Sequence, residues 1–231
     1  MEAIRHTISC EQGRQINLPP LTYPLVLTFE HYIKITKQSP EILINKKKKT
    51  IDVNIYEGIP IHLSTLKDSD GFIAREDGNI DWLSTFDDGT NDDHDYKLFY
   101  ENIDVTLMGN KTYQQVLTFP VPFPYPDKKN YVFSHEKQKS NEFVEFVNDD
   151  IYEFINHLKK QPGKDIWLVG GAQLNQLLLS FGLIDEIIMT IIPIALGKGI
   201  SIFGQQSIEQ KFKYSDSKIF STGCVQIKYT I

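Results

Sequence analysis

The chain has 231 residues, of which 41% are hydrophobic and 23% are charged, and its net charge is -6. These values are ordinary for a globular protein with one full core, and the negative charge excludes a broad basic surface for nucleic acid or membrane. Cys10 and Cys224 show no disulfide or metal-ligand spacing, so we expect no metal site. No apolar run reaches the roughly 20 residues that span a bilayer, and the start has no secretory pattern. We therefore expect a soluble, cytoplasmic protein.

The first part of the chain differs from the rest. Residues 1–49 contain several prolines, end in a run of lysines at 46–49, and show no sustained hydrophobic period. Like charges repel one another and keep a segment extended and solvated. We expect 1–49 to be an N-terminal extension, partly disordered, and 50–231 to form the main domain.

From residue 50 onward, strand-like and helix-like patterns alternate. The expected strands are 59–66, 105–108, 131–134, 142–147, 166–169, 186–194, 208–219 and 223–231, and the expected helices are 96–103, 112–117, 151–158 and 174–181. Asn148 and Asp149 are candidate caps for the third helix. Helices between strands indicate a mostly parallel sheet, whereas the last two strands, joined by a turn, indicate an antiparallel edge. The expected fold class is α/β, with a mostly parallel central sheet flanked by helices and an antiparallel C-terminal edge.

The glycine pair Gly170-Gly171 is the most informative local feature. It follows the apolar run 166–169 and leads directly into the helical pattern 174–181. Glycine allows the backbone close approach to a ligand, and the free N–H groups and dipole of a helix start favour phosphate. The segment alone fits either an anion site or a tight turn with no ligand.

Several segments together resemble the dihydrofolate reductase-like proteins, and the resemblance is strongest to the reductase (C-terminal) domain of the bacterial riboflavin biosynthesis deaminase-reductase and its stand-alone relatives. The matching segments are Asp70–Ala74, Gly78–Leu83, Leu107–Tyr113, Tyr131–Ser134, Val169–Ala172, Leu183–Glu186, Pro193 and Leu196–Gly199 with Phe203. They occur in the family's order and cover roughly residues 51–231. Each motif is weak alone, and their order and spacing make the combination specific.

The resemblance implies that NADPH binds across the carboxyl ends of the strands, where open α/β sheets bind ligands. It assigns Gly109, Lys111 and Thr112 to the cofactor phosphates and Ser134 to the adenosine ribose and its phosphate. It assigns the four residues Gly170, Gly171, Ala172 and Gln173 to the pyrophosphate and the nicotinamide.

The chain departs from the family pattern at three places. Asn110 and His135 stand where the family often has arginine, which removes bidentate phosphate contacts and leaves NADH possible beside NADPH. Lys67–Ser69 is an apparent insertion before Asp70, which puts the loop over the nicotinamide in question.

Two acidic residues are candidates for contact with the reacting groups. By resemblance, Asp95 matches the carboxylate at the start of the helix before the second strand, with Asp92 and Asp93 as competitors; it also fits an ordinary helix N-terminal acid. Asp81 is the second candidate, and Trp82 beside it offers a flat face for a heterocyclic substrate. The alternative is a turn acid beside a core tryptophan.

The remaining predictions concern the substrate and assembly. Asp70 is expected to shape the turn near the nicotinamide and to contact the substrate. The leading hypothesis is an NADPH-dependent reductase of a pteridine- or pyrimidine-like heterocycle, resembling 5-amino-6-(5-phosphoribosylamino)uracil reductase. The alternatives are a dihydrofolate reductase and a catalytically inactive dinucleotide-binding or scaffold module. Arg75 is the only arginine of the matched region, and this scarcity argues against both the ribosylaminopyrimidine reductase and the dihydrofolate reductase. A homodimer is implied by the resemblance alone.

Overall fold

The computed structural model describes residues 58–86, 93–204 and 209–231, and before them only four short strands. The chain divides into two compact units, Met1–Gly58 and Ile59–Ile231. In the first unit, the described strands form two antiparallel pairs: β1 (Thr7–Ser9) with β2 (Gln15–Asn17), and β3 (Glu41–Asn45) with β4 (Thr50–Asn54). The lysine run at 46–49 lies outside the described residues.

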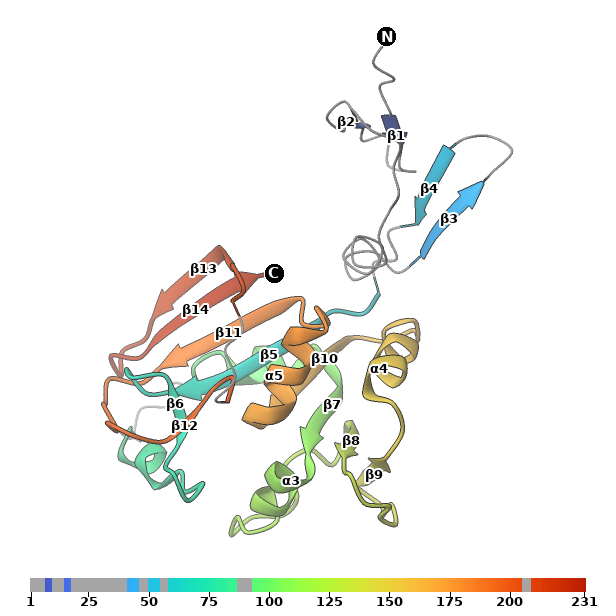
Figure 1. Cartoon of the computed structure of the whole chain (residues 1–231). Helices are drawn as coiled ribbons and strands as arrows, with labels where there is room; N and C mark the ends of the chain where they lie inside the picture. Colours follow the sequence, from blue (N-terminus) through green and yellow to red (C-terminus); the bar gives the residue numbers. More distant parts are fainter. Residues whose placement is uncertain are drawn as a thin grey trace. The chain divides into compact units, whose positions relative to one another are not determined.

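The second unit is built on an eight-stranded sheet (Figure 1). Its strands are β5 (Ile61–Lys67), β7 (Ile103–Gly109), β8 (Lys129–Phe133), β9 (Val144–Val147), β10 (Asp165–Gly170), β11 (Glu186–Ile191), β13 (Lys213–Ile219) and β14 (Val225–Thr230). The order across the sheet is β13-β14-β11-β5-β10-β7-β8-β9. The strands from β11 to β9 are parallel, and β14 and β13 add an antiparallel edge. This confirms the predicted fold class.

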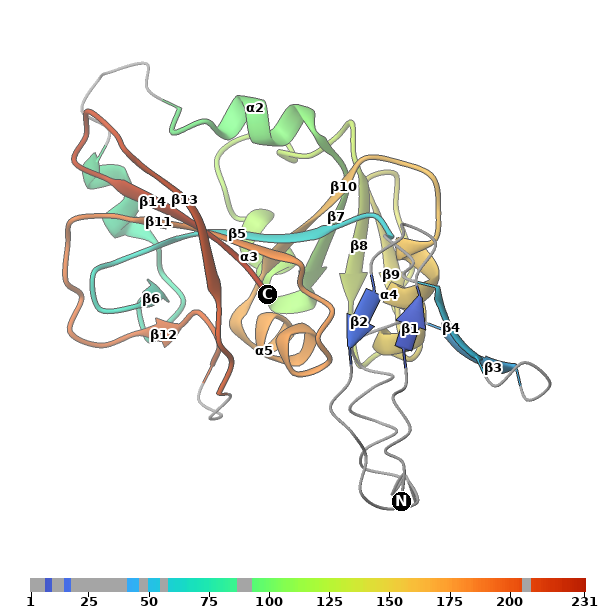
Figure 2. The same cartoon turned by 90° about the horizontal axis from the view of Figure 1, so that it is seen from above.

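Helices cover both faces of this sheet (Figure 2). They are α2 (Tyr96–Glu101), α3 (Asn110–Val116), α4 (Ile151–Lys159) and α5 (Ala172–Ser180). Apolar residues of α4 and α5 pack with Leu63, Leu107 and Leu168 on one face. On the other face, α2 and α3 pack around Met108 and Trp167. Because the central strands are buried on both faces, their sequences read as continuous apolar runs rather than alternating ones.

Most predicted boundaries shift by one or two residues, and the strand expected from residue 208 begins at Lys213. The run expected to continue to residue 194 leaves the sheet after Ile191, because Pro193 has no N–H to donate to a strand ladder. The cap of α4 is Asp150, whose carboxylate accepts a hydrogen bond from the backbone N–H of Glu153 at 3.0 Å. Asn148 donates instead to the Ser134 carbonyl, at 2.9 Å.

Three short elements lie outside the eight-stranded sheet. They are β6 (Phe72–Ala74), the 3-10 helix η1 (Asp81–Phe86) and β12 (Ile200–Ser201), which pairs antiparallel with β6. A Cβ on Gly199 would lie 2.3 Å from the Ala74 carbonyl oxygen, so β6 and β12 pack closely only with glycine there. None of the helices among the described residues has the length and apolar character needed to cross a membrane.

Candidate active site

Two glycine turns lie side by side at the carboxyl ends of neighbouring strands. Gly109 ends β7 and Gly170 ends β10, and these strands pair in parallel. A Cβ built on Gly109 would lie 3.9 Å from the Gly170 carbonyl oxygen and 4.0 Å from the Gly171 nitrogen. The two turns therefore present adjacent backbone groups with no side chain between them.

Each turn opens directly into a helix whose start has no side-chain cap. Gly109 is the N-cap of α3 and Gly171 that of α5, and neither glycine has a side chain that could bond the first helical amides. The peptide bond between Gly170 and Gly171 is cis. The Thr112 hydroxyl oxygen lies 2.9 Å from the position that a Cβ of Gly171 would take. Uncapped amides beside a hydroxyl form a site suited to phosphate oxygens.

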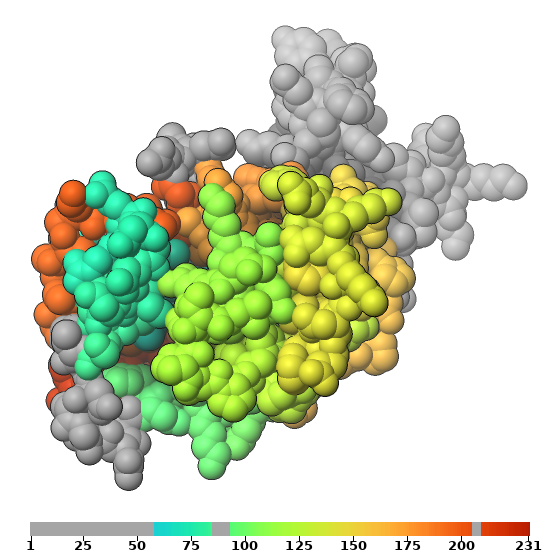
Figure 3. Space-filling model, turned by 90° about the horizontal axis from the view of Figure 1, so that it is seen from below, coloured from blue at the N-terminus to red at the C-terminus, as the bar shows by residue number. Residues whose placement is uncertain are grey.

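The remaining cofactor candidates flank these turns. Lys111 and Gln173 are exposed, each within the first two residues of its helix, whereas Ala172 is buried. Ser134 directly follows β8, which pairs with β7 so that Phe133 lies opposite Gly109. Figure 3 shows this side of the molecule, with the segment of α3 between that of β6 and η1 and that of β8 and β9.

Ser134 belongs to a structured loop. Its hydroxyl oxygen accepts hydrogen bonds from the Glu136 N–H at 3.2 Å and from the Gln138 amide at 3.0 Å, so its own hydrogen can still be donated to a ligand. Asn148 donates to the carbonyls of Ser134 and His135. The loop is thus held by bonds that leave the Ser134 hydroxyl with donor capacity.

A buried asparagine behind the glycine pair was missed by the sequence analysis. Asn175 donates through its side-chain amide to the Ile202 carbonyl at 2.9 Å. Its Oδ1 lies 3.4 Å from the position of a Cβ on Gly170, and it has no hydrogen-bond partner among the described residues. This side chain therefore links α5 to the segment after β12 and lies behind the Gly170 turn. The signal in the sequence was a lone asparagine within an otherwise leucine-rich helix face.

The apparent insertion before Asp70 is part of a turn that side-chain hydrogen bonds hold in place. Asp68 is fully buried, and its carboxylate accepts hydrogen bonds from the N–H groups of Phe72 at 2.7 Å and Leu196 at 2.8 Å. Asp70 accepts from the Gly197 N–H at 2.9 Å. The two carboxylates join the loop after β5 to the segment after β11. In this structure Asp70 shapes a turn, and Asp68 is a structural residue that the turn pattern alone did not identify.

Among the described residues, one apolar side chain of the central strand is partly exposed near these turns. Leu66, near the carboxyl end of the central strand β5, is 41% exposed. Helix α2 has six residues, and its Phe99 ring lies over His62 and Trp167, nearer the start of the strands. The strand register places Val169 on the same face as Leu66. We call Leu66, Val169 and Tyr96, the 46%-exposed first residue of α2, the open floor.

Asp95 lies at the edge of the open floor, immediately before Tyr96. Its backbone is left-handed, with φ 63°, and its carboxylate makes no cap bond to α2. Both carboxylate oxygens instead accept hydrogen bonds from the Lys218 ammonium, at 2.7 and 2.8 Å. His94, also with positive φ, bonds through its ring to the Thr222 hydroxyl at 2.9 Å. The hairpin of β13 and β14 thus determines where the Asp95 carboxylate lies.

Asp81 and Trp82 are adjacent in sequence but lie in different surroundings. Asp81 is exposed and accepts hydrogen bonds from Arg75 at 2.7 and 3.3 Å, and this pairing lowers the pKa of its carboxyl. Asp81 is therefore an anion at neutral pH and not a proton donor. Trp82 is 1% exposed and packs with Ile192 and Phe220, so its ring offers no free face to a ligand in this structure.

The comparisons with known proteins agree with this architecture. The model of the RibD C-terminal domain matches residues 65–226. The chain belongs to this family. It is 38% identical over 161 residues to the uncharacterized protein YwjB of Bacillus subtilis (strain 168), covering 69% of this chain and 91% of that protein.

Solved structures show the same fold. A putative riboflavin biosynthesis protein from Shewanella sp. PV-4 matches with a TM-score of 0.66 and 27% identity, covering 75% of this chain and 98% of the other. Dihydrofolate reductase from Enterococcus faecalis, complexed with NADP(H), matches with a TM-score of 0.53 and 16% identity, covering 74% and 95%. At that identity the second match shows the fold alone. Among the described residues, no group of three or more His, Cys, Asp or Glu side chains is placed to hold a metal ion.

Proposed function

We propose that this protein is an NADPH-dependent reductase of a pteridine- or pyrimidine-like heterocycle, with NADH as the alternative cofactor. The observation that carries the proposal is the adjacency of the two glycine turns, each opening into an uncapped helix start. Family membership supports a pyrimidine reductase-like activity. The NADP(H) bound to the Enterococcus faecalis relative, which has this fold, supports a nicotinamide cofactor.

The residues divide into two groups in this proposal. Gly109, Lys111, Thr112 and Ser134, with the segment 170–173, hold the dinucleotide by its phosphates and adenosine ribose. The bound nicotinamide supplies the hydride. The open floor lies next to Gly170 and gives the heterocycle an apolar surface, from which water is excluded when substrate binds.

The polar contacts to substrate are assigned to the rim of the open floor. Asp95 is our first choice, because it is held at the start of α2 beside Tyr96. Asp81 is the second choice, as an anionic hydrogen-bond acceptor. Trp82 and Asp70 act indirectly: Trp82 packs η1 against Ile192 and Phe220, and Asp70 holds the turn at Gly197. A homodimer and a cytoplasmic location stay predictions.

A second candidate is a module that binds a dinucleotide or a partner without catalysis. The observation that favours it is the presence of Asn110 and His135 at positions where the family often has arginine. An inactive module would bind NADPH without reducing any heterocycle, or would bind no dinucleotide. The fold alone does not separate these functions.

The decisive experiment is a fluorescence titration of the full chain with NADPH and with NADH. Gly171→Asp places a carboxylate where the phosphates are expected, and we expect it to weaken binding by about 100-fold or more, because like charges repel in a partly desolvated site. Its folding cost is modest, since the added Cβ meets only the tip of Thr112, a hydroxyl that can rotate.

Gly163→Asn provides the matched control. This glycine precedes β10 at the opposite end of the strand, and a Cβ there makes only ordinary contacts, at 3.4 and 3.5 Å. We expect the control to bind cofactor like the wild type. Wild-type protein that binds neither dinucleotide at millimolar concentration, or a Gly171→Asp variant with unchanged affinity, would contradict the reductase proposal.

A further inference from the structure

We propose that Tyr96, Tyr125 and Asp127 form a second binding site beside the open floor, and that this site takes a hydroxyl-bearing substituent of the heterocycle. We call these three residues the tyrosine subsite. The inference rests on the proposed function and adds to it the direction in which the substituent leaves the ring. That direction runs from the open floor along α2 toward Asp127.

Trp167 fixes the position of the tyrosine subsite relative to the open floor. Its ring centroid lies 6.0 Å from that of Tyr96 and 5.2 Å from that of Tyr125. Val169, a member of the open floor, packs against the cluster that contains Tyr125 and Trp167. The two tyrosines therefore contact the same tryptophan, and Tyr96 belongs both to the floor and to the subsite.

Tyr125 carries a hydroxyl group without a partner. The residue is 8% exposed, and its hydroxyl makes no hydrogen bond to any described residue. Burial is the main cause of its raised pKa, and the nearby Tyr96 adds to the effect, so the phenol is neutral at physiological pH. Polar groups of buried side chains normally have a partner. A bound ligand can supply the one that Tyr125 lacks.

Asp127 provides a carboxylate within reach of the same ligand. Its side chain is 59% exposed, the Tyr100 hydroxyl donates to its Oδ1, and the Lys128 ammonium lies 3.0 Å from its Oδ2. The bonds from Tyr100 and Lys128 lower the pKa of Asp127, which is therefore an anion at neutral pH. Each carboxylate oxygen can accept a further hydrogen bond. Asp127 can thus bind a donor on a ligand without breaking its present bonds.

Packing around Tyr100 holds the tyrosine subsite together. The Tyr100 ring stacks on Tyr96 with centroids 5.6 Å apart, and the Lys128 ammonium lies 4.0 Å from the centre of the Tyr100 ring. The Lys128 side chain is only 9% exposed, so its charge is engaged by Asp127 and by the ring. Tyr96, Tyr100 and Asp127 form a continuous row of contacts that leads away from the open floor.

A hydroxyl group matches the free groups of the tyrosine subsite best. It can accept a hydrogen bond from a phenol and donate one to a carboxylate at the same time. An ammonium group only donates, which would leave the hydrogens of the two phenols without an acceptor. An apolar substituent would leave both phenols and Asp127 without a ligand partner. The aromatic rings beside these groups offer an apolar surface to the carbon atoms of a hydroxylated chain.

The test compares ligands that differ in the substituent of one ring. The full chain is first saturated with NADP+, whose binding is measured separately, so a failure of the proposed function appears as absent cofactor binding. The ligand pairs are 1-methyluracil with uridine and 6-methylpterin with neopterin, each titrated by calorimetry. We expect the hydroxylated member of at least one pair to bind at least about fivefold more tightly, an energy of about 1 kcal/mol.

Tyr125→Phe tests the unpartnered hydroxyl, because it keeps the ring that packs on Trp167. We expect this variant to bind the hydroxylated member about three- to tenfold more weakly and the methyl member as before. Tyr152→Phe removes a hydroxyl from a ring that packs against Phe181 in the core of the other sheet face, and this matched control should change neither affinity.

Asp127→Asn tests the carboxylate in the same way. The amide oxygen accepts hydrogen bonds more weakly than a carboxylate, so we expect a similar loss of affinity for the hydroxylated member alone. Asp149→Asn, at an exposed position before α4, makes the same charge change and is the control. It should leave the preference for the hydroxylated member unchanged.

Three results would overturn the inference while NADP+ still binds. The first is wild-type protein that shows no preference for the hydroxylated member of either pair, or that binds none of the four ligands. The second is an unchanged preference in Tyr125→Phe and in Asp127→Asn. The third is an equal loss of affinity for both members of a pair in these variants, which would make the tyrosine subsite a structural support and not a binding site.

Discussion

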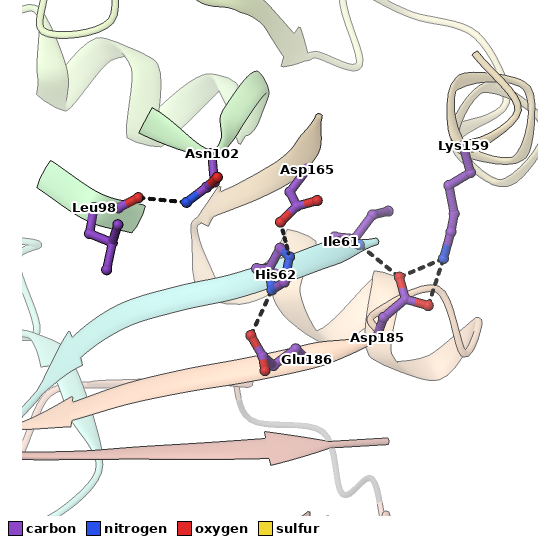
Figure 4. A network of polar contacts seen from close by, with 8 residues as sticks. All are labelled: Ile61, His62, Leu98, Asn102, Lys159, Asp165, Asp185 and Glu186. Atoms are coloured by element: carbon purple, nitrogen blue, oxygen red, sulfur yellow. Dashed lines mark hydrogen bonds and ion pairs between the residues drawn. The ribbon is translucent and has the colours of Figure 1, made fainter. Parts of the chain in front are cut away.

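The two ends of the parallel sheet are built on opposite principles. At the carboxyl ends, Gly109 and Gly170 carry no side chains, and the helix starts beside them are uncapped. At the amino ends, ionised side chains pair with one another across strands (Figure 4). The glycine turns leave backbone groups available to a ligand, whereas the ion pairs at the amino ends link neighbouring strands to one another.

The network at the amino ends is centred on His62 of β5. Its Nδ1 lies 2.8 Å from the Glu186 carboxylate and its Nε2 lies 2.9 Å from the Asp165 carboxylate, so the ring joins β11, β5 and β10. Beside it, Asp185 accepts hydrogen bonds from the Ile61 N–H at 2.7 Å and from the Lys159 ammonium at 2.6 Å.

Because the two ends of the sheet differ in this way, the stability of the fold and the affinity for the cofactor can be changed separately. Substitutions in the amino-end network should alter stability, with a pH dependence, and leave cofactor binding unchanged. Substitutions at the carboxyl ends should alter binding, and they should alter stability only where a side chain holds a loop. The four predictions below test this comparison.

The largest effect is expected from Asp68→Ala. This change leaves the partly buried N–H groups of Phe72 and Leu196 without their acceptor and empties a fully buried position, and we expect a loss of about 3 kcal/mol in the free energy of unfolding. Cofactor affinity should also fall, because the turn beside the site is released. Urea denaturation measures the first effect. Asp77→Ala, which removes only an exposed turn bond to Asn79, is the control and should cost less than about 0.5 kcal/mol.

Asn175→Leu tests whether the Asn175 side chain supports the glycine pair or only fills space in the core. The Ile202 carbonyl loses its donor, at an expected cost of about 2 kcal/mol, and the Gly170 turn loses its backing, so NADPH should bind more weakly. The neighbouring Gln176→Leu removes a buried amide N–H group that has no acceptor among the described residues, and we expect it to be neutral or stabilising. Equal effects in thermal unfolding and NADPH titration would contradict this assignment.

His62→Gln should give a pH-dependent loss of stability. Burial opposes the charged form of His62, but Glu186 and Asp165 outweigh it and raise the pKa above 6.5, while the hydrogen bond to His62 lowers the pKa of Glu186 below 4.5. The histidine contribution is complete below pH 6.5 and disappears as the pH rises through the raised pKa. The glutamate contribution is complete above pH 4.5 and disappears as the pH falls through the lowered one.

The stability difference between wild type and His62→Gln should therefore be greatest between about pH 4.5 and 6.5, on the order of 1 to 3 kcal/mol, the range for hydrogen bonds to charged groups. Chemical denaturation across pH measures it. His157→Gln, which removes a histidine on α4 that bonds only Gln161, is the control and should show no such dependence. A difference that grows toward alkaline pH would contradict the assignment, and so would a change in NADPH affinity.

The smallest effect on stability is expected from Arg75→Met. The pair with Asp81 is exposed and is screened by solvent, so we expect no measurable change in melting temperature. The hydrogen bond from Arg75 is the main cause of the lowered pKa of Asp81, and that pKa should return toward 3.8 in the variant. A carboxyl titration by NMR measures this change, and an unchanged Asp81 pKa would show that another group sets it.

Part of this site could be read from local patterns. The apolar run that stops at Gly170-Gly171 identified β10 and the start of α5, because a buried parallel strand and a glycine turn both leave strong local signals. The order of the motifs identified the family. The network of His62, Asp165 and Glu186 left no such signal, since its members lie 103 and 124 residues apart in the sequence.

The sequence by itself determined the alternation of strands and helices, the antiparallel C-terminal edge and the glycines that end β7 and β10, because each depends on neighbouring residues. The tertiary structure alone decided that these glycines meet, that Asp68 is buried, that Trp82 has no free face and that Leu66 is left uncovered. Those outcomes depend on strand order and on the short length of α2, which bring together residues far apart in the chain. The same packing places Asp81 against Arg75 and Asp95 against Lys218.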